Sequence, residues 1–433
     1  MLYMLIRVLP ALLFAISASA VSQQDEFPGN PLTLGEALKW TVSSHPSIES
    51  SQLEVSRSAI AHEFNTSVST PAVDVLIVPQ RVDRVAPDAP DSLDDSTASL
   101  RVVQPLYDFG RKKAASEVTL AELEAASLEH ERNVRMAALE TLDKFFAVLL
   151  ADLNYSVRDE KMTLSFLRFN RMVEENSIYE THAEVDLLEK ESIYRDLFYQ
   201  REEARIDRIT TRRALALAMG MGSHVEYTPR DLASPDVSVF NDRQVPEFEE
   251  LLEAVLKDSV ELKLARLNMK RQESELEKID KNFMPKLDAF IEGTEWRQET
   301  GSRNAAMIGL RLQVPLFADE QKRRDRKIGQ IDIDRSRLKM NELEYQLRQR
   351  VFEIWKTLRV LQTRLAAARI KSDYRDQYMD RSRTLYELEE VSDLGDAQAE
   401  QVRALLELRQ VEFQIVLTWA QINVMTGKDV LEF

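Results

Sequence analysis

Two pairs of acidic side chains recur in this sequence at the same spacing. Asp186 and Glu189 are three residues apart, and so are Asp393 and Asp396, about 210 residues further along the chain. Residues at this spacing share one face of a helix, so each pair presents two neighbouring carboxylates. Such groups can attract cations or act in acid–base catalysis, and crowding of like charges raises carboxyl pKa values.

The rest of the sequence offers no setting for catalysis. The sequence does not show the alternating strands and helices that would form a pocket around the carboxylates. The five histidines match no metal-ligand spacing and there is no cysteine. The net charge is −16, and no basic face of the kind that binds nucleic acid stands out. We therefore predict a protein that is not an enzyme, with no cofactor, no metal site and no nucleic-acid partner.

The acidic pairs must be positioned by very long helices. From Arg111 to about Tyr179 there is neither proline nor glycine, and from Asp319 to Tyr386 the only such residue is Gly329. At 1.5 Å per residue, each helix would extend about 100 Å. Apolar residues step by four and three, as in a coiled coil: Leu343, Leu347, Val351, Ile354, Leu358, Leu361, Leu365 and Ala368.

Each long helix is followed by a shorter returning helix. The returning helices are predicted at 186–219 and 396–425, and each ends at a glycine, Gly220 or Gly427. The turns of the two helical hairpins therefore fall near 178–186 and 385–396. Both acidic pairs are predicted just after these turns.

Short strands precede each long helix. Ile308, Leu310, Leu312 and Val314 alternate with less apolar residues, and 287–292 does the same. Segments 73–79 and 98–103 are the equivalents in the first half. Alternation over about ten residues is typical of strands in a transmembrane barrel. Four strands are too few to close a barrel, because natural ones have about eight or more, so closure requires several chains.

The sequence contains two similar copies of one repeat unit. Gln104-Pro-Leu-Tyr107 recurs as Val314-Pro-Leu-Phe317, and Tyr179-Glu180 recurs as Tyr386-Glu387 in the same order. We predict a first repeat at 21–226, a linker rich in proline and aspartate at 227–246, and a second repeat at 247–433. Each repeat is expected to contain a helix, two strands and a long hairpin.

The N-terminus has the features of a secretory signal peptide. Arg7 precedes an apolar run, and Ala18-Ser-Ala20 supplies small residues at a cleavage site. We predict that residues 1–20 direct export. No later apolar run is long enough for a transmembrane helix.

The duplicated motifs resemble those of the TolC-like outer-membrane efflux and secretion channels, also called outer membrane factors. Glu36-Ala-Leu leads to His45-Pro46, and Met284-Pro-Lys-Leu287 begins a strand. Gln104-Pro-Leu-Tyr-Asp-Phe-Gly110 resembles the strand-to-helix motif, with Pro105 and Gly110 in place; the second copy keeps Pro315 but lacks the glycine. The resemblance covers about Leu34 to Gly427.

This resemblance implies a mainly α-helical fold with a small β part. Three chains would form a homotrimer with a twelve-stranded barrel in outer-membrane lipid, four strands per chain, continued by a periplasmic tunnel of coiled-coil hairpins. It also implies a passive exit duct in a tripartite efflux pump or type I secretion system. The partners would be a periplasmic adaptor (a membrane fusion protein) and an inner-membrane transporter.

The resemblance assigns roles to the hairpin turns. Asp393 and Asp396 resemble the paired aspartates that ring the periplasmic entrance, and Asp186 and Glu189 occupy the corresponding first-copy positions. In a threefold assembly each carboxylate becomes a ring that favours cations. The residues expected to contact the adaptor are Tyr179, Glu180, Tyr386, Glu387 and Glu389. The glycine usual in the family's turn is missing from 179–184 and from 386–392, so these turns must be built differently or lie a residue or two elsewhere.

Two other classes of protein remain open on the sequence alone. A periplasmic adaptor also has a long helical hairpin, although it usually carries one rather than two. An extracytoplasmic coiled-coil tether would also explain the helices, but it leaves the duplicated strand pairs unexplained.

Overall fold

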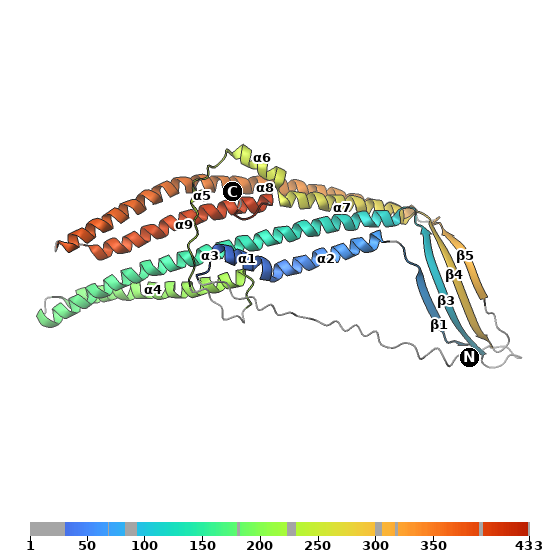
Figure 1. The fold of residues 1–433 in the computed structure, drawn as a ribbon, viewed down its shortest axis with the longest axis horizontal. Helices are drawn as coiled ribbons and strands as arrows, with labels where there is room; N and C mark the ends of the chain where they lie inside the picture. The colour runs from blue at the N-terminus through green and yellow to red at the C-terminus, as the bar shows by residue number, and fades with distance from the viewer. Residues whose placement is uncertain are drawn as a thin grey trace.

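The computed structural model describes residues 31–67, 69–82, 93–179, 182–222, 231–298, 305–316, 319–388 and 393–431. The predicted signal peptide lies outside these residues, as do Glu180, Phe317 and Glu389. The described chain forms a narrow, elongated molecule with a small sheet at one end and two helical hairpins at the other (Figure 1).

The two long helices match the predicted ranges closely. Helix α3 spans Arg111–Tyr179 and α8 spans Asp319–Glu387, with 69 residues each. The returning helices are α4 (Glu184–Ala218) and α9 (Leu394–Thr426). Both predicted terminal glycines, Gly220 and Gly427, have positive φ, which glycine adopts without steric cost. The prediction of two long helical hairpins is confirmed.

Two helices, rather than the single predicted one, precede the strands in each half. Helix α1 (Leu34–Ser44) is followed directly by α2 (Pro46–Thr66), and α6 (Phe248–Asp258) by α7 (Val260–Asn282). The chain breaks at Pro46 because proline has no N–H to continue a helix but fits its first turn. At the second break, Ser259 accepts a hydrogen bond from the Leu262 N–H. The remaining helix is α5 (Ser238–Asn241).

The strands form one antiparallel sheet in the order β1-β3-β4-β5. They are β1 (Ala72–Val78), β3 (Leu93–Tyr107), β4 (Lys286–Gln298) and β5 (Ala305–Gln313), and the two-residue β2 (Arg81–Val82) also pairs with β3. The two central strands are longer than predicted because β3 and β4 pair along almost their whole lengths. The two halves of the chain thus meet in the middle of the sheet.

The strand register gives the sheet one apolar face. Val73, Val102, Ile291 and Ile308 lie side by side across the four strands. In the next row Asp74, Arg101, Glu292 and Met307 lie on the opposite face, where Arg101 pairs with Glu292 at 2.8 Å. On the apolar face, 82% of the Ile308 surface is exposed. Within the described residues, β1 and β5 each keep one edge without a strand partner.

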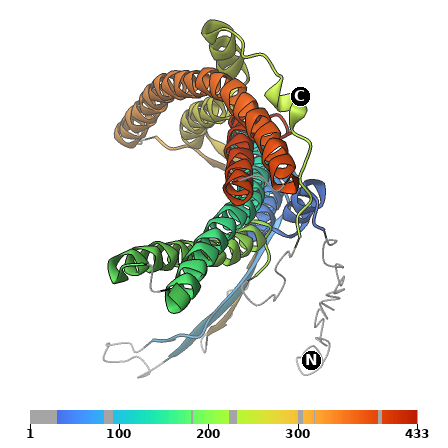
Figure 2. The same cartoon turned by 90° about the vertical axis from the view of Figure 1, so that its left-hand side faces the viewer.

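The helices form a curved wall one helix thick. Near the sheet the neighbours are α2, α3, α7 and α8 in that order; near the tips they are α4, α3, α9 and α8. Viewed along its length, the wall is curved, with the end of the described chain on its convex side (Figure 2). No described helix is both long enough and apolar enough to cross a membrane.

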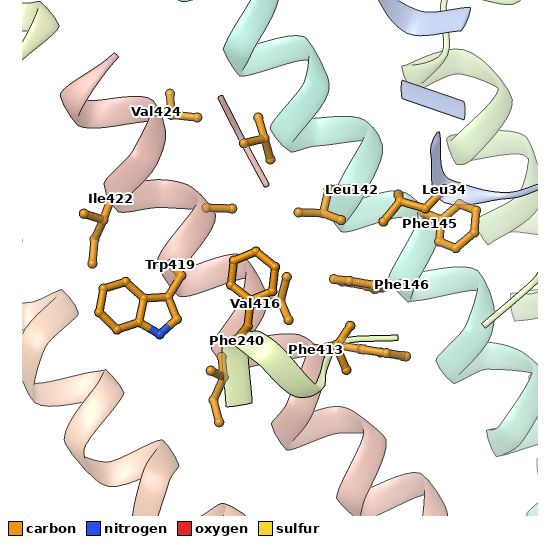
Figure 3. Close-up of a cluster of buried hydrophobic side chains, with 14 of the residues drawn as sticks. Leu34, Leu142, Phe145, Phe146, Phe240, Phe413, Val416, Trp419, Ile422 and Val424 are labelled. Carbon is orange, nitrogen blue, oxygen red and sulfur yellow. The ribbon is translucent and has the colours of Figure 1, made fainter. Parts of the chain in front are cut away.

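The main apolar core lies midway along the wall. Helices α1, α5 and α6 and the end of the described chain cover α3 and α9 there, and Figure 3 shows the side chains that meet. Phe146 of α3 stacks on Phe413 of α9, with ring centroids 4.2 Å apart and planes 2° apart. Both rings are almost fully buried. Because one ring comes from each half, this contact joins the two hairpins.

Two pairs of helices meet end to end at this level. A Cβ on Gly220, after α4, would come within 2.6 Å of the His45 Cα, just before α2. A Cβ on Gly427, after α9, would lie 3.0 Å from the Val260 Cγ2 at the start of α7. The short helices on the sheet side therefore continue the lines of the returning helices.

Candidate functional site

The first hairpin turn lies between Tyr179 and Glu184. Tyr179, one of the predicted adaptor contacts, ends α3 with 71% of its surface exposed. Asp186 lies in the first turn of α4 and Glu189 in the second, and both are exposed. Carboxylates are favourable here because a helix N-terminus carries partial positive charge. Glu189 lies 3.6 Å from the Lys190 ammonium, and both groups are well exposed to solvent.

The second turn lies between Glu387 and Leu394. Tyr386 and Glu387, two more of the predicted adaptor contacts, are exposed at the end of α8. Asp393 is the N-cap residue of α9 rather than a helical residue, and its side chain makes no capping hydrogen bond. Asp396 lies in the first turn of the helix. The two aspartates are therefore less equivalent than their spacing predicts.

Asp393 is bound to its own hairpin. Its carboxylate accepts hydrogen bonds from the Tyr378 hydroxyl at 2.7 Å and the Ser382 hydroxyl at 3.3 Å, both on α8. The Tyr378 hydrogen bond holds the pKa of Asp393 below its usual value, while the Asp393 carboxylate raises the pKa of Tyr378. Within one chain the pKa of Asp393 thus shifts in the direction opposite to the rise predicted for crowded rings.

Asp396 is bound to the other hairpin. Its carboxylate pairs with the Arg168 guanidinium of α3, with 50% and 62% of the two side chains exposed. Gly395 makes this approach possible, because a Cβ there would come within 2.2 Å of the Leu164 side chain on α3. Asp396 is thus part of the contact between the hairpins.

Further polar contacts surround the Asp396–Arg168 pair. Gln398 donates to Glu160 at 2.8 Å, and Lys161 lies 3.7 Å from Glu400. A cavity of about 390 Å³ opens between α3, α4 and α9, and its charged lining residues are Lys161, Arg168, Lys190, Asp396 and Glu400. The sequence did not point to these partners of the acidic residues, because the contact between α3 and α9 joins residues more than 200 positions apart.

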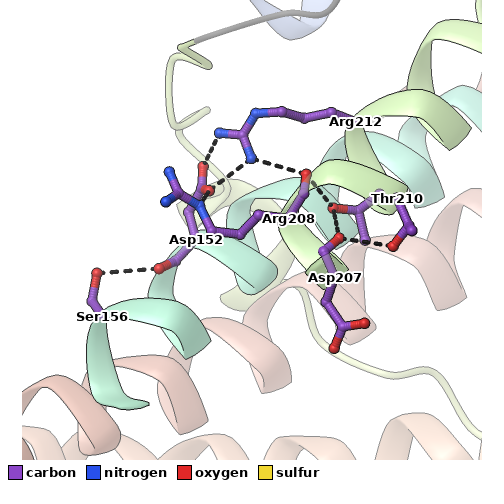
Figure 4. A network of polar contacts seen from close by, with 7 residues as sticks. Asp152, Ser156, Asp207, Arg208, Thr210 and Arg212 are labelled. Carbon is purple, nitrogen blue, oxygen red and sulfur yellow. Dashed lines mark hydrogen bonds and ion pairs between the residues drawn. The ribbon is translucent and has the colours of Figure 1, made fainter. Parts of the chain in front are cut away.

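A second polar network lies in the first hairpin, farther from its turn (Figure 4). Asp152 of α3 accepts hydrogen bonds from Arg208 at 2.7 Å and from both terminal nitrogens of Arg212 at 2.8 and 2.9 Å. One helical turn away, Arg201 donates to Tyr155 at 2.9 Å and to Asp159 at 2.8 Å. The guanidinium of Arg208 also lies over the Tyr155 ring, 4.7 Å from its centroid. Charged side chains thus join α3 to α4.

The strand-to-helix motif forms a tight turn between β3 and α3. Pro105 lies at an irregularity of the β3–β4 pairing. Gly110 has a φ of 86°, as its place in the motif requires. The Asp108 carboxylate accepts hydrogen bonds from the N–H groups of Gly110 and Lys112 at 3.0 and 2.8 Å and so caps the helix. In the second half, Pro315 is exposed just beyond β5.

The described side chains of these sites offer charge and shape. Among the described residues, no group of three or more histidine, aspartate or glutamate side chains is arranged to hold a metal ion. The acidic residues of the two turns are exposed or ion-paired. The arrangement can line a passage and hold two hairpins together.

The chain is similar in fold to solved bacterial outer-membrane proteins. An outer-membrane channel of Campylobacter jejuni, CmeC, superposes with a TM-score of 0.71 at 12% identity, covering 92% of this chain and 87% of the other. The Neisseria gonorrhoeae channel MtrE, in its open state, gives 0.68 at 12% identity, with coverages of 92% and 89%. The outer-membrane protein VceC of Vibrio cholerae gives 0.65 at 13%, with coverages of 92% and 96%.

These likenesses define the fold of the chain. It has the architecture of the TolC-like outer-membrane channels, in which long helical hairpins continue a small antiparallel sheet. No protein-family model and no curated protein matches the sequence. The resemblance noted in the sequence is therefore confirmed at the level of the fold.

Proposed function

We propose that this protein is one protomer of a passive exit duct in the outer membrane. Three copies would close the sheet into a twelve-stranded barrel and the helical walls into a periplasmic tunnel. The observation that carries this proposal is the wall itself, because it is one helix thick, curved, and has unsatisfied edges on both sides. A wall of this kind becomes stable only when its edges meet.

The edge formed by α8 carries an exposed apolar seam. Ile331, Leu338, Tyr345 and Phe352 follow each other at intervals of seven residues, and all are exposed. This heptad differs from the buried stripe that includes Leu347, Ile354 and Leu361. A coiled-coil helix with two apolar stripes packs against two partners. Apart from the contact of Phe352 with Phe248 of α6, no helix of the described residues packs along this stripe as the second partner.

The opposite edge carries a complementary seam. On α2, Leu53 and Ile60 are exposed seven residues apart; on α4, Tyr199 and Ile206 are exposed at the same interval. The two edges differ in sequence, so contact between copies would be head-to-tail, and the curvature of the wall would let such contacts close into a ring. The free edges of β1 and β5 lie on matching sides of the wall.

The apolar face of the sheet supports a membrane location. Val73, Ile291 and Ile308 are exposed on it, while charged Arg101 and Glu292 lie on the opposite face. If this face lies against lipid and the charged face lines a water-filled lumen, the apolar side chains avoid water and the charged side chains remain hydrated. A periplasmic adaptor and an inner-membrane transporter would deliver the substrate to the hairpin tips, where Asp186, Glu189, Asp393 and Asp396 would line the entrance.

Engineered disulfides test the ring directly, because the native chain has no cysteine. Leu53 and Ile331 lie about equally far from the strand-side ends of α2 and α8. Leu53→Cys combined with Ile331→Cys is expected to give covalent trimers on oxidation, in protein extracted from outer membranes. Each single variant serves as the control and should stay monomeric on denaturing gels.

Electron microscopy of the extracted protein gives a second readout. We expect threefold particles whose helical stem alone exceeds about 100 Å. Recovery of monomers from the soluble periplasmic fraction, without cross-linking of the double variant, would reject the duct and favour a coiled-coil tether.

A further inference from the structure

Positive charge gathers where the helices meet the sheet, in a protein whose net charge is −16. We use the name basic collar for the lysine and arginine side chains at the start of α3, the end of α7 and the start of α8. The basic collar consists of Arg111, Lys112, Lys113, Lys278, Lys281, Lys322, Arg323, Arg324, Arg326 and Lys327.

Direct contacts place these three helix ends at one level. Arg111 of α3 donates a hydrogen bond to the carbonyl oxygen of Met284, just after α7. The Lys281 side chain passes 3.8 Å from the position that a Cβ on Gly110 would occupy. Arg326 of α8 pairs with Asp280 of α7 at 3.3 Å. The three helix ends therefore lie together at the end of the helical wall that adjoins the sheet (Figure 1).

The nearby acidic groups neutralise only part of the collar. Asp108 accepts backbone hydrogen bonds at the start of α3. Three further acids each pair with one collar side chain: Asp280 with Arg326, Asp325 with Arg324 and Glu275 with Lys278. Asp319 and Glu320 lie in the first turn of α8. Lys113 and Lys327 are exposed, and neither forms a hydrogen bond or ion pair with any residue that the structure describes.

The collar opposes the stability of α3. Arg111, Lys112 and Lys113 occupy the first turn of this helix, which contains no acidic residue. Cations at a helix N-terminus are unfavourable because they add to the positive end of the helix dipole. Arg111 and Lys112 donate hydrogen bonds to the carbonyl oxygens of Met284 and Ser67, so Lys113 is the cation of this turn that a negatively charged partner would account for.

Coiled-coil position places part of the collar on the outside of the wall. Lys327 is separated by multiples of seven residues from Trp355 and Gln362 on α8. These two side chains donate to the carbonyl oxygens of Pro246 and Arg243 at 3.1 and 3.2 Å. Residues this far apart share a helix face in a coiled coil. The 231–247 segment covers the convex side of the wall (Figure 2), so Lys327 also faces outward.

We propose that the basic collar binds the phosphate headgroups of anionic phospholipids in the leaflet that borders the helices. This inference rests on the proposed membrane location of the sheet. Lipid tails would cover the apolar face that includes Ile291 and Ile308, and the collar would lie at the level of the headgroups. A basic segment beside a membrane contributes about 1 kcal/mol for each lysine or arginine near an anionic surface.

The test compares two triple variants of the full-length protein in neutral detergent. Lys113→Gln, Arg323→Gln and Lys327→Gln remove collar charges that are exposed. The matched control carries Lys39→Gln, Lys257→Gln and Lys263→Gln, which remove the same net charge midway along the molecule. Short-chain phosphatidylglycerol is titrated, and its apparent affinity is read from the shift in thermal unfolding.

We expect native protein and control to bind phosphatidylglycerol more tightly than phosphatidylcholine. At about fivefold for each of the three charges, the collar variant should lose roughly a hundredfold in affinity for phosphatidylglycerol. Affinity for phosphatidylcholine should not change, and added salt should weaken only the anionic preference. Inorganic phosphate should give no comparable shift.

Two other outcomes distinguish a wrong collar proposal from a wrong membrane location. Equal binding of phosphatidylglycerol by the collar variant and the native protein would overturn the collar proposal, as would an equal shift with inorganic phosphate. Failure of native protein to bind either lipid or to enter phosphatidylcholine vesicles would instead reject the membrane location, and with it the proposed function.

Discussion

The two hairpins have similar lengths and the same place in the fold, but different forces hold them together. In the second hairpin, Leu358 and Leu361 belong to a buried stripe on α8, and α9 contributes a larger buried set that includes Val411 and Ile415. In the first, α4 buries only Ala204, Leu215 and Ala218 among the described side chains.

Charged contacts add to the smaller buried set of α4 in the first hairpin, through Asp152, Asp159 and the arginines that bind them. An apolar seam is insensitive to salt and to pH, whereas an ion-paired seam depends on both. The contacts between α3 and α4 are therefore expected to depend more on salt than the buried stripe of α8 does. The following changes test this division, from the largest expected effect to the smallest.

Leu358→Ala should give the largest loss of stability. Leu358 is fully buried, and truncation of a buried leucine costs about 2–5 kcal/mol because it removes contacts and leaves a cavity. Chemical denaturation in detergent should show this loss equally at low and high salt. Leu167→Ala, at an exposed position of α3, is the control and should cost far less; equal losses would contradict the apolar support.

Asp152→Asn should destabilise the first hairpin by about 1–3 kcal/mol, since it removes the carboxylate charge that Arg208 and Arg212 both bind. The Arg212 side chain is only 11% exposed, so solvent compensates it poorly. The matched change in the second hairpin is Glu407→Gln, which breaks the half-exposed pair with Lys371 and should cost 0–1 kcal/mol. Thermal unfolding measured at several salt concentrations compares the two variants, and a larger effect of Glu407→Gln would reverse the comparison.

Asp393→Asn combined with Asp396→Asn should weaken cation selectivity and raise leak conductance in planar bilayers. The loss of Asp396 removes the pair with Arg168 between the hairpins, and the loss of both carboxylates removes the predicted rings. Asp186→Asn with Glu189→Gln is the matched change at the first turn. Unchanged selectivity in the Asp393/Asp396 variant would reject the entrance assignment while leaving the duct intact.

Acidification should loosen the second turn slightly, through Asp393. Its pKa in the folded chain lies below the usual 3.8, so its contribution is present at neutral pH and is lost as pH falls below that value. After correction for the intrinsic exchange rate, the protection of residues 393–400 should therefore fall with acid, and Tyr378→Phe should make this fall smaller because the folded and open pKa values of Asp393 become more alike. An equally large fall in both proteins would show that the Tyr378 hydrogen bond does not control the titration.

Much of the fold was predictable because its signals are local. The ends of α3 and α8 follow from the absence of proline and glycine, and Gly220 and Gly427 mark the ends of the returning helices. The alternating residues of β5 predicted a strand with one apolar side, and the register places Ile308 and Leu310 there.

The partners of the candidate residues could not be predicted in the same way. Asp393 and Asp396 have the same spacing as Asp186 and Glu189, yet each aspartate binds a different helix. Which helix lies opposite is set by packing between distant segments, such as Gly395 on Leu164. The breaks at His45 and Ser259 were missed because a helix that stops and restarts keeps its apolar periodicity.

The end-to-end helix contacts near Gly220 and Gly427 have a mechanical consequence. Two of the four helical lines in the wall are interrupted, one between α2 and α4 and the other between α7 and α9. Both interruptions lie midway along the molecule. Of the described helices in the wall, only α3 and α8 run through this region without a break. These two helices therefore provide its resistance to bending. A force applied at the hairpin tips would therefore bend the molecule midway along its length. The two interruptions would act as hinges there, and no helical turn would have to unwind.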